Sequence, residues 1–200
     1  MATLPTLSLP LCHESALVRI INGRKRYVSC SECSAIMGAN WANPKNAPST
    51  AALNTLYNAG SHTANGGRTT PQIVAAVSKV YSHAPKLFAT FDAAISALRS
   101  DYVLTVAGNY HMLPSNLQRW DRPFAGSVDA WHDVCAGPIA ANDTSDDPLV
   151  WWRDPLAHGS KLYPWLYAFR GEWVNWSTVV AFANGMDGAK GITGYPKNVW

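Results

Sequence analysis

The chain has 200 residues, and only 14% of them are charged, against about 25% in an average soluble domain. Nine Trp, eight Tyr and five Phe exclude intrinsic disorder, which goes with few aromatic and many charged residues. The net charge is +3, and the sequence has no basic stripe beyond Gly23-Arg24-Lys25-Arg26, so no nucleic-acid partner is expected. We predict a single domain over residues 1–200, with a short arm over about 1–15 and an irregular tail over about 186–200.

The sequence contains neither a membrane-spanning pattern nor an export pattern. No apolar run approaches the ~18–20 residues that a helix needs to cross a bilayer. The segment from Met1 to Leu11 has no positively charged start and contains two prolines, unlike a secretory signal peptide. We therefore expect a soluble protein made in a cytoplasm, with no signal peptide and no membrane span.

The first half of the chain has the periodicity of α-helices. Residues 29–38 open with Ser-Cys-Ser-Glu, a capping box in which Ser29 is the N-cap and Glu32 stands at N3. Apolar residues then recur at helical spacing along this segment. Further helices are predicted from about Thr50 to Gly60, from Thr70 with Pro71 in its first turn, and from Thr90 to about Leu98.

From Tyr102 onward the pattern changes to that of β-strands. Residues 130–136 alternate, which places His132 and Val134 on one face and Trp131, Asp133 and Cys135 on the other. Helices followed by strands predict the α+β class, with N-terminal helices packed on a C-terminal antiparallel β-sheet. The predicted strands cover 102–108, 130–136, 149–154 and about 163–169, and a last helix runs from about Asn175 to Gly185.

The first predicted helix and two of the strands together suggest a cysteine active site. Cys30 lies in the first helical turn, where backbone N–H groups and the helix dipole stabilise a thiolate. A cysteine nucleophile needs an imidazole base, which His132 provides on its strand. Asp154, at the end of the next strand, can accept a hydrogen bond from that imidazole and fix its tautomer. Cys33 stands one turn after Cys30 and is the alternative nucleophile.

The same residues leave a zinc site open as an alternative. Cys30-Ser-Glu-Cys33 is a CxxC pair, and His132-Asp-Val-Cys135 supplies a His and a further Cys. Two cysteine-containing pairs of this kind have the ligand types of a structural zinc site. In this interpretation the chain is a zinc-stabilised binding module, whereas the cysteine active site needs no cofactor.

Several segments also resemble a known family. The stretch Cys30-Ser-Glu-Cys-Ser34-Ala-Ile-Met37 resembles the Cys-Thr-x-x-Ser-x-x-Met sequence that opens the active-site helix of papain-like peptidases of the bacteriocin-leader-processing type. Other segments are similar, in the same order, to parts of small papain-like proteins from tailed phages of actinobacteria. These segments are Ala107-Gly-Asn-Tyr110, Phe124-Ala-Gly-Ser-Val-Asp-Ala-Trp-His132, Trp151-Trp-Arg-Asp-Pro-Leu156 and Phe169-Arg-Gly-Glu-Trp173, and the resemblance covers about residues 26–184.

The resemblance implies a papain-like fold and a catalytic triad of Cys30, His132 and Asp154. In that family a Gln several residues upstream of the nucleophile usually supplies an oxyanion donor, and this chain has no Gln there. Asn22 and Arg24 are the candidates for that role in this sequence. The residues that flank the nucleophile and the base also depart from the family pattern, because Ser and Trp stand where Asp and Gly are usual.

These observations lead to one leading function and two alternatives. The leading function is a phage-encoded, virion-associated cysteine peptidase that cleaves a peptide or a peptidoglycan cross-link amide. The first alternative is a catalytically silent tail or capsid-associated protein that retains the papain-like fold, and the second is the zinc module. The excess of Trp over what one small core needs suggests docking against other virion proteins or self-association. The expected location is the virion, or the host cytoplasm before assembly.

Overall fold

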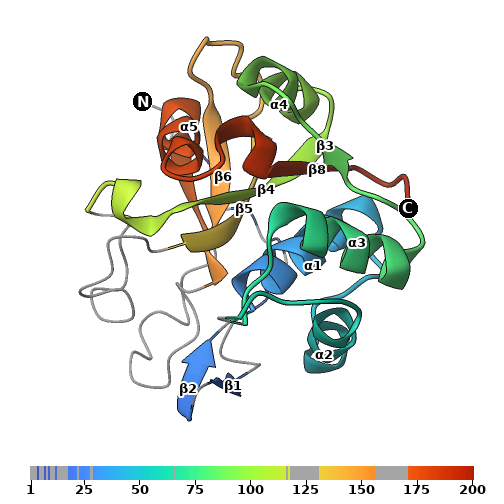
Figure 1. Ribbon diagram of the computed structural model, residues 1–200. Helices are drawn as coiled ribbons and strands as arrows, with labels where there is room; N and C mark the ends of the chain where they lie inside the picture. The colour runs from blue at the N-terminus through green and yellow to red at the C-terminus, as the bar shows by residue number, and fades with distance from the viewer. Residues whose placement is uncertain are drawn as a thin grey trace.

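Six antiparallel strands form one sheet that separates two groups of helices (Figure 1). The strand order is β3-β8-β4-β5-β6-β7. In the computed structural model the described residues are 29–64, 66–115, 117, 131–155 and 171–200, the hairpin residues 18–21 and 23–27, and residues 4, 7, 9 and 12. The strands of the sheet are β3 (Lys86–Leu87), β4 (Tyr102–Asn109), β5 (Trp131–Ile139), β6 (Leu149–Arg153), β7 (Glu172–Asn175) and β8 (Ile192–Pro196).

Three helices cover one face of the sheet: α1 (Cys30–Ala42), α2 (Thr50–Asn58) and α3 (Thr70–Tyr81). Helix α1 lies against β4, β5 and β8, while α2 and α3 pack on α1 from the other side. Almost every residue of α1 is therefore buried, which its small side chains allow. The core of this face includes Ile36 and Met37 of α1, Leu53 and Leu56 of α2, Ile73 and Val77 of α3, and Val103, Cys135 and Tyr195 of the sheet.

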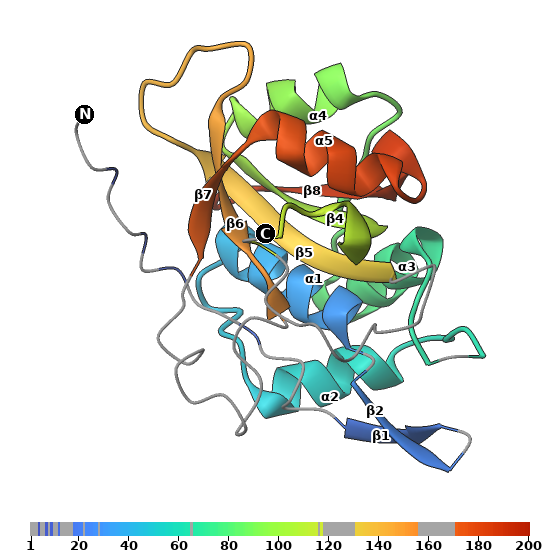
Figure 2. The same ribbon diagram turned by 90° about the vertical axis from the view of Figure 1, so that its left-hand side faces the viewer.

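Two helices cover the opposite face: α4 (Phe91–Leu98) and α5 (Trp176–Asn184). The 3-10 turns η2 (Tyr110–Met112) and η5 (Gly188–Gly191) both contact α5. Buried aromatic and aliphatic side chains fill this second core, as expected for sheet residues that alternate between two covered faces. Its members include Leu104, Val106, Val134, Trp152 and Phe182. Figure 2 shows the two helix layers on either side of the sheet.

The α+β class and most of the predicted elements are confirmed. The helix expected from Thr70 spans Thr70–Tyr81 with Pro71 in its first turn, and the last helix ends at Asn184 before Gly185. The strand expected over 163–169 lies outside the described residues. A hairpin that the sequence analysis did not predict, β1 (Val18–Ile21) with β2 (Arg24–Tyr27), precedes α1 and lies apart from the main sheet (Figure 2).

The prediction of an irregular tail over 186–200 is wrong for its central part. Residues 192–196 form β8, which pairs with β3 on one side and with β4 on the other. Ile192 and Tyr195 are fully buried on the two faces of the sheet. The glycine and proline content of the segment suggested a loop, but pairing with two neighbouring strands outweighs weak β-propensity.

The predicted capping box at the start of α1 is also wrong, although the helix begins where expected. Ser29 is the N-cap residue and its carbonyl accepts a hydrogen bond from the Cys33 N–H. The Glu32 carboxylate does not turn back to the N-cap, because it is buried and paired with Arg68. Glu32 therefore forms an interior ion pair with Arg68 instead of the predicted hydrogen bond to the backbone of Ser29.

Gly38 of α1 allows the helix to lie directly on the ring of Tyr195. A Cβ atom at this position would stand 2.5 Å from Cδ2 of Tyr195, whose side chain is fully buried. Replacing Gly38 with alanine is expected to destabilise the fold by about 1–3 kcal/mol, because overpacking outweighs the ~1 kcal/mol gain in helix propensity. Urea unfolding of the G38A variant measures this, and equal or higher stability would contradict the close packing of α1 on β8.

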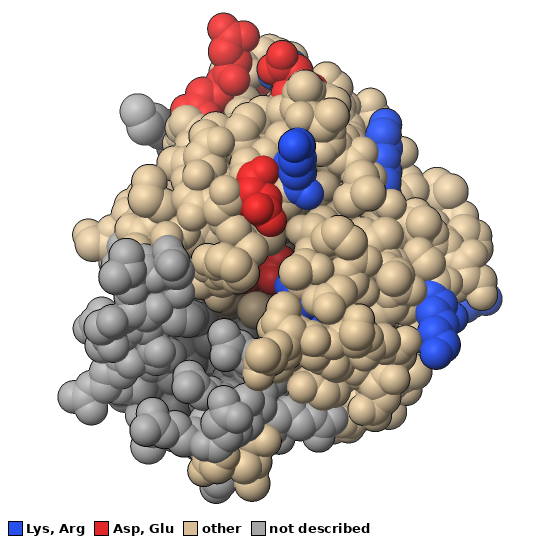
Figure 3. All heavy atoms as spheres, in the orientation of Figure 1, with Lys and Arg blue, Asp and Glu red and all other residues tan. Residues whose placement is uncertain are grey.

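The surface reflects the low content of charged residues. In Figure 3 most of the visible face is uncharged, and acidic side chains gather over the β5–β6 hairpin, which carries Asp143, Asp146 and Asp147. Asp147 accepts hydrogen bonds from the backbone and side chain of Ser177, in the first turn of α5. Among the described residues, no helix has the length and apolar character required to cross a membrane.

Candidate active site

His132 and Asp154 form a buried hydrogen-bonded pair. His132 is the second residue of β5, and Asp154 directly follows β6, the neighbouring strand. His132 Nε2 lies 2.6 Å from Asp154 Oδ1, and the exposed fractions of the two residues are 1% and 2%. A carboxylate in this position favours the tautomer in which Nε2 carries the proton and donates to it, which leaves Nδ1 as the nitrogen that can accept a proton.

An aromatic ring packs against the imidazole of His132. Tyr110, in η2 at the end of β4, is almost completely buried, and its ring centroid lies 5.8 Å from that of His132 in an edge-to-face arrangement. This ring and the Asp154 carboxylate fix the orientation of the imidazole from two sides. Tyr110 belongs to one of the segments of family resemblance, and no site role was predicted for it from the sequence.

Cys30 lies beside the start of β5. It is the first residue of α1, is partly exposed, and its Sγ is 3.8 Å from Oδ2 of Asp133. The N-terminal turn of α1 and the first residues of β5 are neighbours in both views of the fold (Figures 1 and 2). The backbone N–H groups of a helix N-terminus favour negative charge on this sulfur, whereas the Asp133 carboxylate disfavours it.

The pleat of β5 separates the two predicted partners of the site. Successive strand residues point to opposite faces, so Asp133 leaves β5 on the side of α1 and His132 on the side of α5. The structure thus brings His132 and Asp154 together and places Cys30 against the residue next to His132. Asp133 was not among the predicted site residues, although the alternation of residues 130–136 already placed it opposite His132.

Removing the charge of Asp133 is expected to make Cys30 more reactive. In the Asp133→Asn variant, the rate of Cys30 alkylation by iodoacetamide at about pH 7 should rise roughly three- to tenfold, because the thiolate no longer faces a carboxylate. Mass spectrometry of the Tyr27–Lys45 tryptic peptide follows the reaction at Cys30. The Asp146→Asn variant, which changes an exposed carboxylate of the β5–β6 hairpin, is the matched control. An unchanged or slower rate in D133N would show that Asp133 does not control the thiol.

The four residues of the zinc alternative each have a different neighbour. Cys30 lies by Asp133 and His132 by Asp154, while Cys33 contacts Cys12 at 3.2 Å. Arg153 Nη2 donates to Cys135 Sγ at 2.9 Å, and burial raises the pKa of the Cys135 thiol even though the Arg153 charge opposes this. In the part of the chain that the structure describes, no three His, Cys, Asp or Glu side chains are grouped as metal ligands.

The remaining predicted site residues are placed as follows. Cys33, the alternative nucleophile, is fully buried in the core between α1 and the sheet. Arg24 belongs to β2, but its side chain is outside what the structure describes, and Asn22 is outside the described residues altogether. Of the two cysteines, Cys30 is therefore the one that is partly exposed.

A buried ion pair next to Cys30 was missed by the sequence analysis. Glu32, in the first turn of α1, accepts a 2.6 Å hydrogen bond from Arg68 Nε, and both side chains are completely buried. The Nη2 of Arg68 also donates to the carbonyls of Leu56 and Tyr57, the last turn of α2. Arg68 thus joins the turn that carries Cys30 to α2. The spacing of Glu32 suggested only a local cap, and its partner is 36 residues away.

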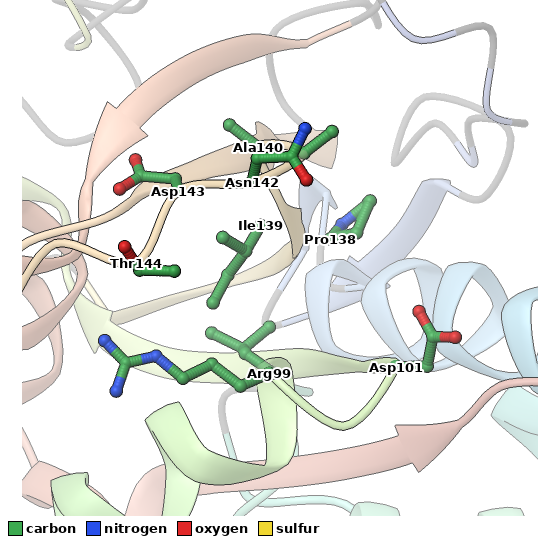
Figure 4. Close-up of a pocket in the computed structure, with 10 residues that line it drawn as sticks. Arg99, Asp101, Pro138, Ile139, Ala140, Asn142, Asp143 and Thr144 are labelled. Carbon is green, nitrogen blue, oxygen red and sulfur yellow. The ribbon is translucent and has the colours of Figure 1, made fainter.

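A surface hollow of about 520 Å³ lies at the far end of β5 from His132 (Figure 4). Figure 4 shows Arg99 and Asp101 on one side of it and the hairpin residues Asn142 and Asp143 on the other. Hydrogen bonds from the Ser145 hydroxyl and from the backbone N–H groups of Leu149 and Ser145 lower the pKa of Asp143. These contacts make Asp143 a turn-forming residue, and the hollow is remote from the His132–Asp154 pair.

Comparisons with protein-family models, with curated proteins and with solved structures found no match to this chain.

Proposed function

We propose that the chain is a papain-like cysteine peptidase or amide hydrolase with Cys30 as nucleophile, His132 as base and Asp154 as the residue that orients the base. The observation that carries the proposal is the buried His132–Asp154 pair, with a distance of 2.6 Å between Nε2 and Oδ1. Buried pairs of this kind are costly unless they are satisfied, and they are concentrated at functional sites. Cys30 at the N-terminus of α1, beside the strand that carries His132, supplies the nucleophile.

The proposal gives each of these groups one role in the chemistry. The Cys30 thiol gives its proton to Nδ1 of His132, and the sulfur attacks the carbonyl carbon of an amide. The C–N bond breaks, and the imidazolium returns its proton to the departing amine while the acyl group stays on sulfur as a thioester. Water, deprotonated by His132, then cleaves the thioester and regenerates the thiol. This first transfer requires the Cys30 sulfur to leave Asp133 and to reach Nδ1 of His132, whose imidazole leaves β5 on the other face of the sheet.

The substrate and the location in this proposal rest on the resemblance to papain-like proteins of tailed phages. The substrate is a peptide or a peptidoglycan cross-link, and the protein is carried to it as part of a virion. The exposed Trp131, 58% accessible and next to His132, supports a substrate surface at the start of β5 because aromatic residues are enriched where partners bind.

A peptidyl epoxide probe, which reacts with activated cysteines, tests the proposal. We expect an adduct on Cys30, found on the Tyr27–Lys45 peptide, and release of soluble fragments from purified peptidoglycan or from denatured protein. The Cys30→Ala variant should lose both the adduct and the release, whereas the Cys33→Ser variant should keep them. A wild-type protein that forms no adduct and releases no fragment would refute the proposed activity.

A second candidate function is a catalytically silent virion protein that retains this fold. The observation that favours it is the contact of Cys30 with Asp133, because a carboxylate next to the thiol opposes formation of the thiolate. The rate of iodoacetamide alkylation separates the two candidates. A rate at about pH 6–7 above that of a peptide cysteine supports the enzyme, and a rate at or below it supports the silent protein.

A further inference from the structure

Two thiols that the proposed activity does not use face each other in the core on the α1 side of the sheet. Cys12, in the segment before the β1–β2 hairpin, and Cys33, in the second turn of α1, have their sulfur atoms 3.2 Å apart. Both side chains are buried, with exposed fractions of 4% and 0%. At this distance one S–H donates to the other sulfur, and a bond of about 2.05 Å requires the two atoms to approach by roughly 1 Å.

We propose that Cys12 and Cys33 are a modification site at which a disulfide-bearing oxidant, such as oxidised glutathione, forms an intrachain disulfide. One thiolate attacks a sulfur of the oxidant, and a mixed disulfide forms while one oxidant thiolate leaves. The second thiolate then attacks the protein sulfur of the mixed disulfide and expels the other oxidant thiolate. The protein loses two protons and two electrons, and the oxidant is reduced to two thiols.

The geometry selects Cys12 over Cys30 as the partner of Cys33. Cys30 and Cys33 form a CxxC pair in the sequence, which suggests a local disulfide. In the fold, however, Cys33 points into the core where it meets Cys12, while Cys30 lies by Asp133 at the start of β5. The carboxylate of Asp133 also lowers the thiolate fraction that Cys30 needs in order to compete.

The disulfide would tie the N-terminal segment to the helix that carries Cys30. The closed loop contains the β1–β2 hairpin and the first turn of α1. Closing a loop restricts the unfolded chain, so the oxidised protein is expected to unfold at a higher temperature than the reduced protein, by roughly 5–10 °C. With Cys33 bonded to Cys12, the thiol of Cys30 cannot be lost to a Cys30–Cys33 bond. This site does not depend on the proposed peptidase activity.

Tryptic peptide mapping of the full chain after treatment with oxidised glutathione tests the proposal. Trypsin places Cys12 on the Met1–Arg19 peptide, and both Cys30 and Cys33 on the Tyr27–Lys45 peptide. We expect these two peptides to be joined in the wild type and in Cys30→Ser, and not in Cys12→Ser or Cys33→Ser. The oxidised Cys30→Ser variant should also show the higher unfolding temperature, and dithiothreitol should reverse both changes.

Three results would overturn the proposal. The first is a disulfide confined to the Tyr27–Lys45 peptide, which would mean that Cys30 and Cys33 pair with each other. The second is a joined peptide that disappears in Cys30→Ser, which would mean that Cys12 pairs with Cys30. The third is persistence of alkylatable thiols at positions 12 and 33 after oxidant treatment under conditions in which the protein opens transiently. None of these results bears on whether Cys30 attacks an amide.

Discussion

Replacing His132 with alanine is expected to slow the reaction of Cys30 with a peptidyl epoxide by about a hundredfold to ten-thousandfold. The imidazole is the base that takes the proton from the thiol, and Asp154 holds it through the 2.6 Å contact at Nε2. The Asp154→Asn variant should retain more activity than His132→Ala. The amide oxygen of asparagine can still accept the hydrogen bond from the Nε2–H of His132, although it lacks the negative charge of the carboxylate. The second-order rate constant for covalent labelling measures both effects.

A matched substitution separates loss of the base from general damage. His83 is an exposed histidine just after α3, and the His83→Ala variant should react with the epoxide at the wild-type rate. The His132 ring packs against Tyr110 in the interior, so its removal could unfold the protein. Circular dichroism must therefore show that the His132→Ala variant is folded. A folded His132→Ala variant that is labelled as fast as the wild type would remove His132 from the proposed mechanism.

Local periodicity was enough to predict the elements that carry the candidate site. The first turn of α1, the alternation along β5 and the end of β6 all lie within a residue or two of their predicted positions. The strands follow from the period of two along the sequence. The start of α1 is predicted from Ser29 as N-cap, and it is confirmed although the capping box itself does not form. The hydrogen bond between His132 and Asp154 then follows from two adjacent antiparallel strands.

Contacts between distant segments could not be predicted in the same way. β8 is a strand because β3 and β4 supply hydrogen-bonding partners on both sides, and nothing in its own glycine- and proline-containing sequence indicates this. Cys12 contacts Cys33 in the second turn of α1 across 21 residues of sequence. Asp133 gained its place beside Cys30 from the packing of α1 on β5, which the alternation alone does not specify.

The contacts of Arg68 are the clearest example of an arrangement that the sequence does not predict, since the ionic partner of Arg68 is 36 residues away in the sequence. The first turn of α1 contributes the Glu32 carboxylate, and the last turn of α2 contributes two carbonyls. Nη1 also reaches the carbonyl of Gln72 in α3 at 3.4 Å. The guanidinium therefore joins three helices at the turn that carries Cys30. Its ionic partner, the Glu32 carboxylate, is completely buried.

Replacing Arg68 with methionine is expected to destabilise the fold by about 3–5 kcal/mol. Methionine preserves much of the side-chain volume but removes the guanidinium from the buried Glu32 carboxylate, which then has only His62 Nε2, 3.5 Å from Oε1, as a basic neighbour among the ion pairs of the described residues. It also leaves the α2 carbonyls without their donor. Urea unfolding followed by tryptophan fluorescence measures the change. The Arg99→Met variant is the matched control, since Arg99 is exposed and donates to a single loop carbonyl, so its effect should stay within about 0.5 kcal/mol.

The double variant Arg68→Met with Glu32→Gln identifies the source of the loss. If the uncompensated carboxylate causes most of the destabilisation, neutralising Glu32 should recover part of the stability that Arg68→Met loses, and the two changes should not be additive. If the lost hydrogen bonds to α2 dominate, the double variant should be no more stable than Arg68→Met. An Arg68→Met variant within 1 kcal/mol of the wild type would mean that the ion pair does not hold the three helices together.

Because the pair anchors the first turn of α1, loss of stability in Arg68→Met should be accompanied by faster alkylation of Cys33, which is fully buried in the native core.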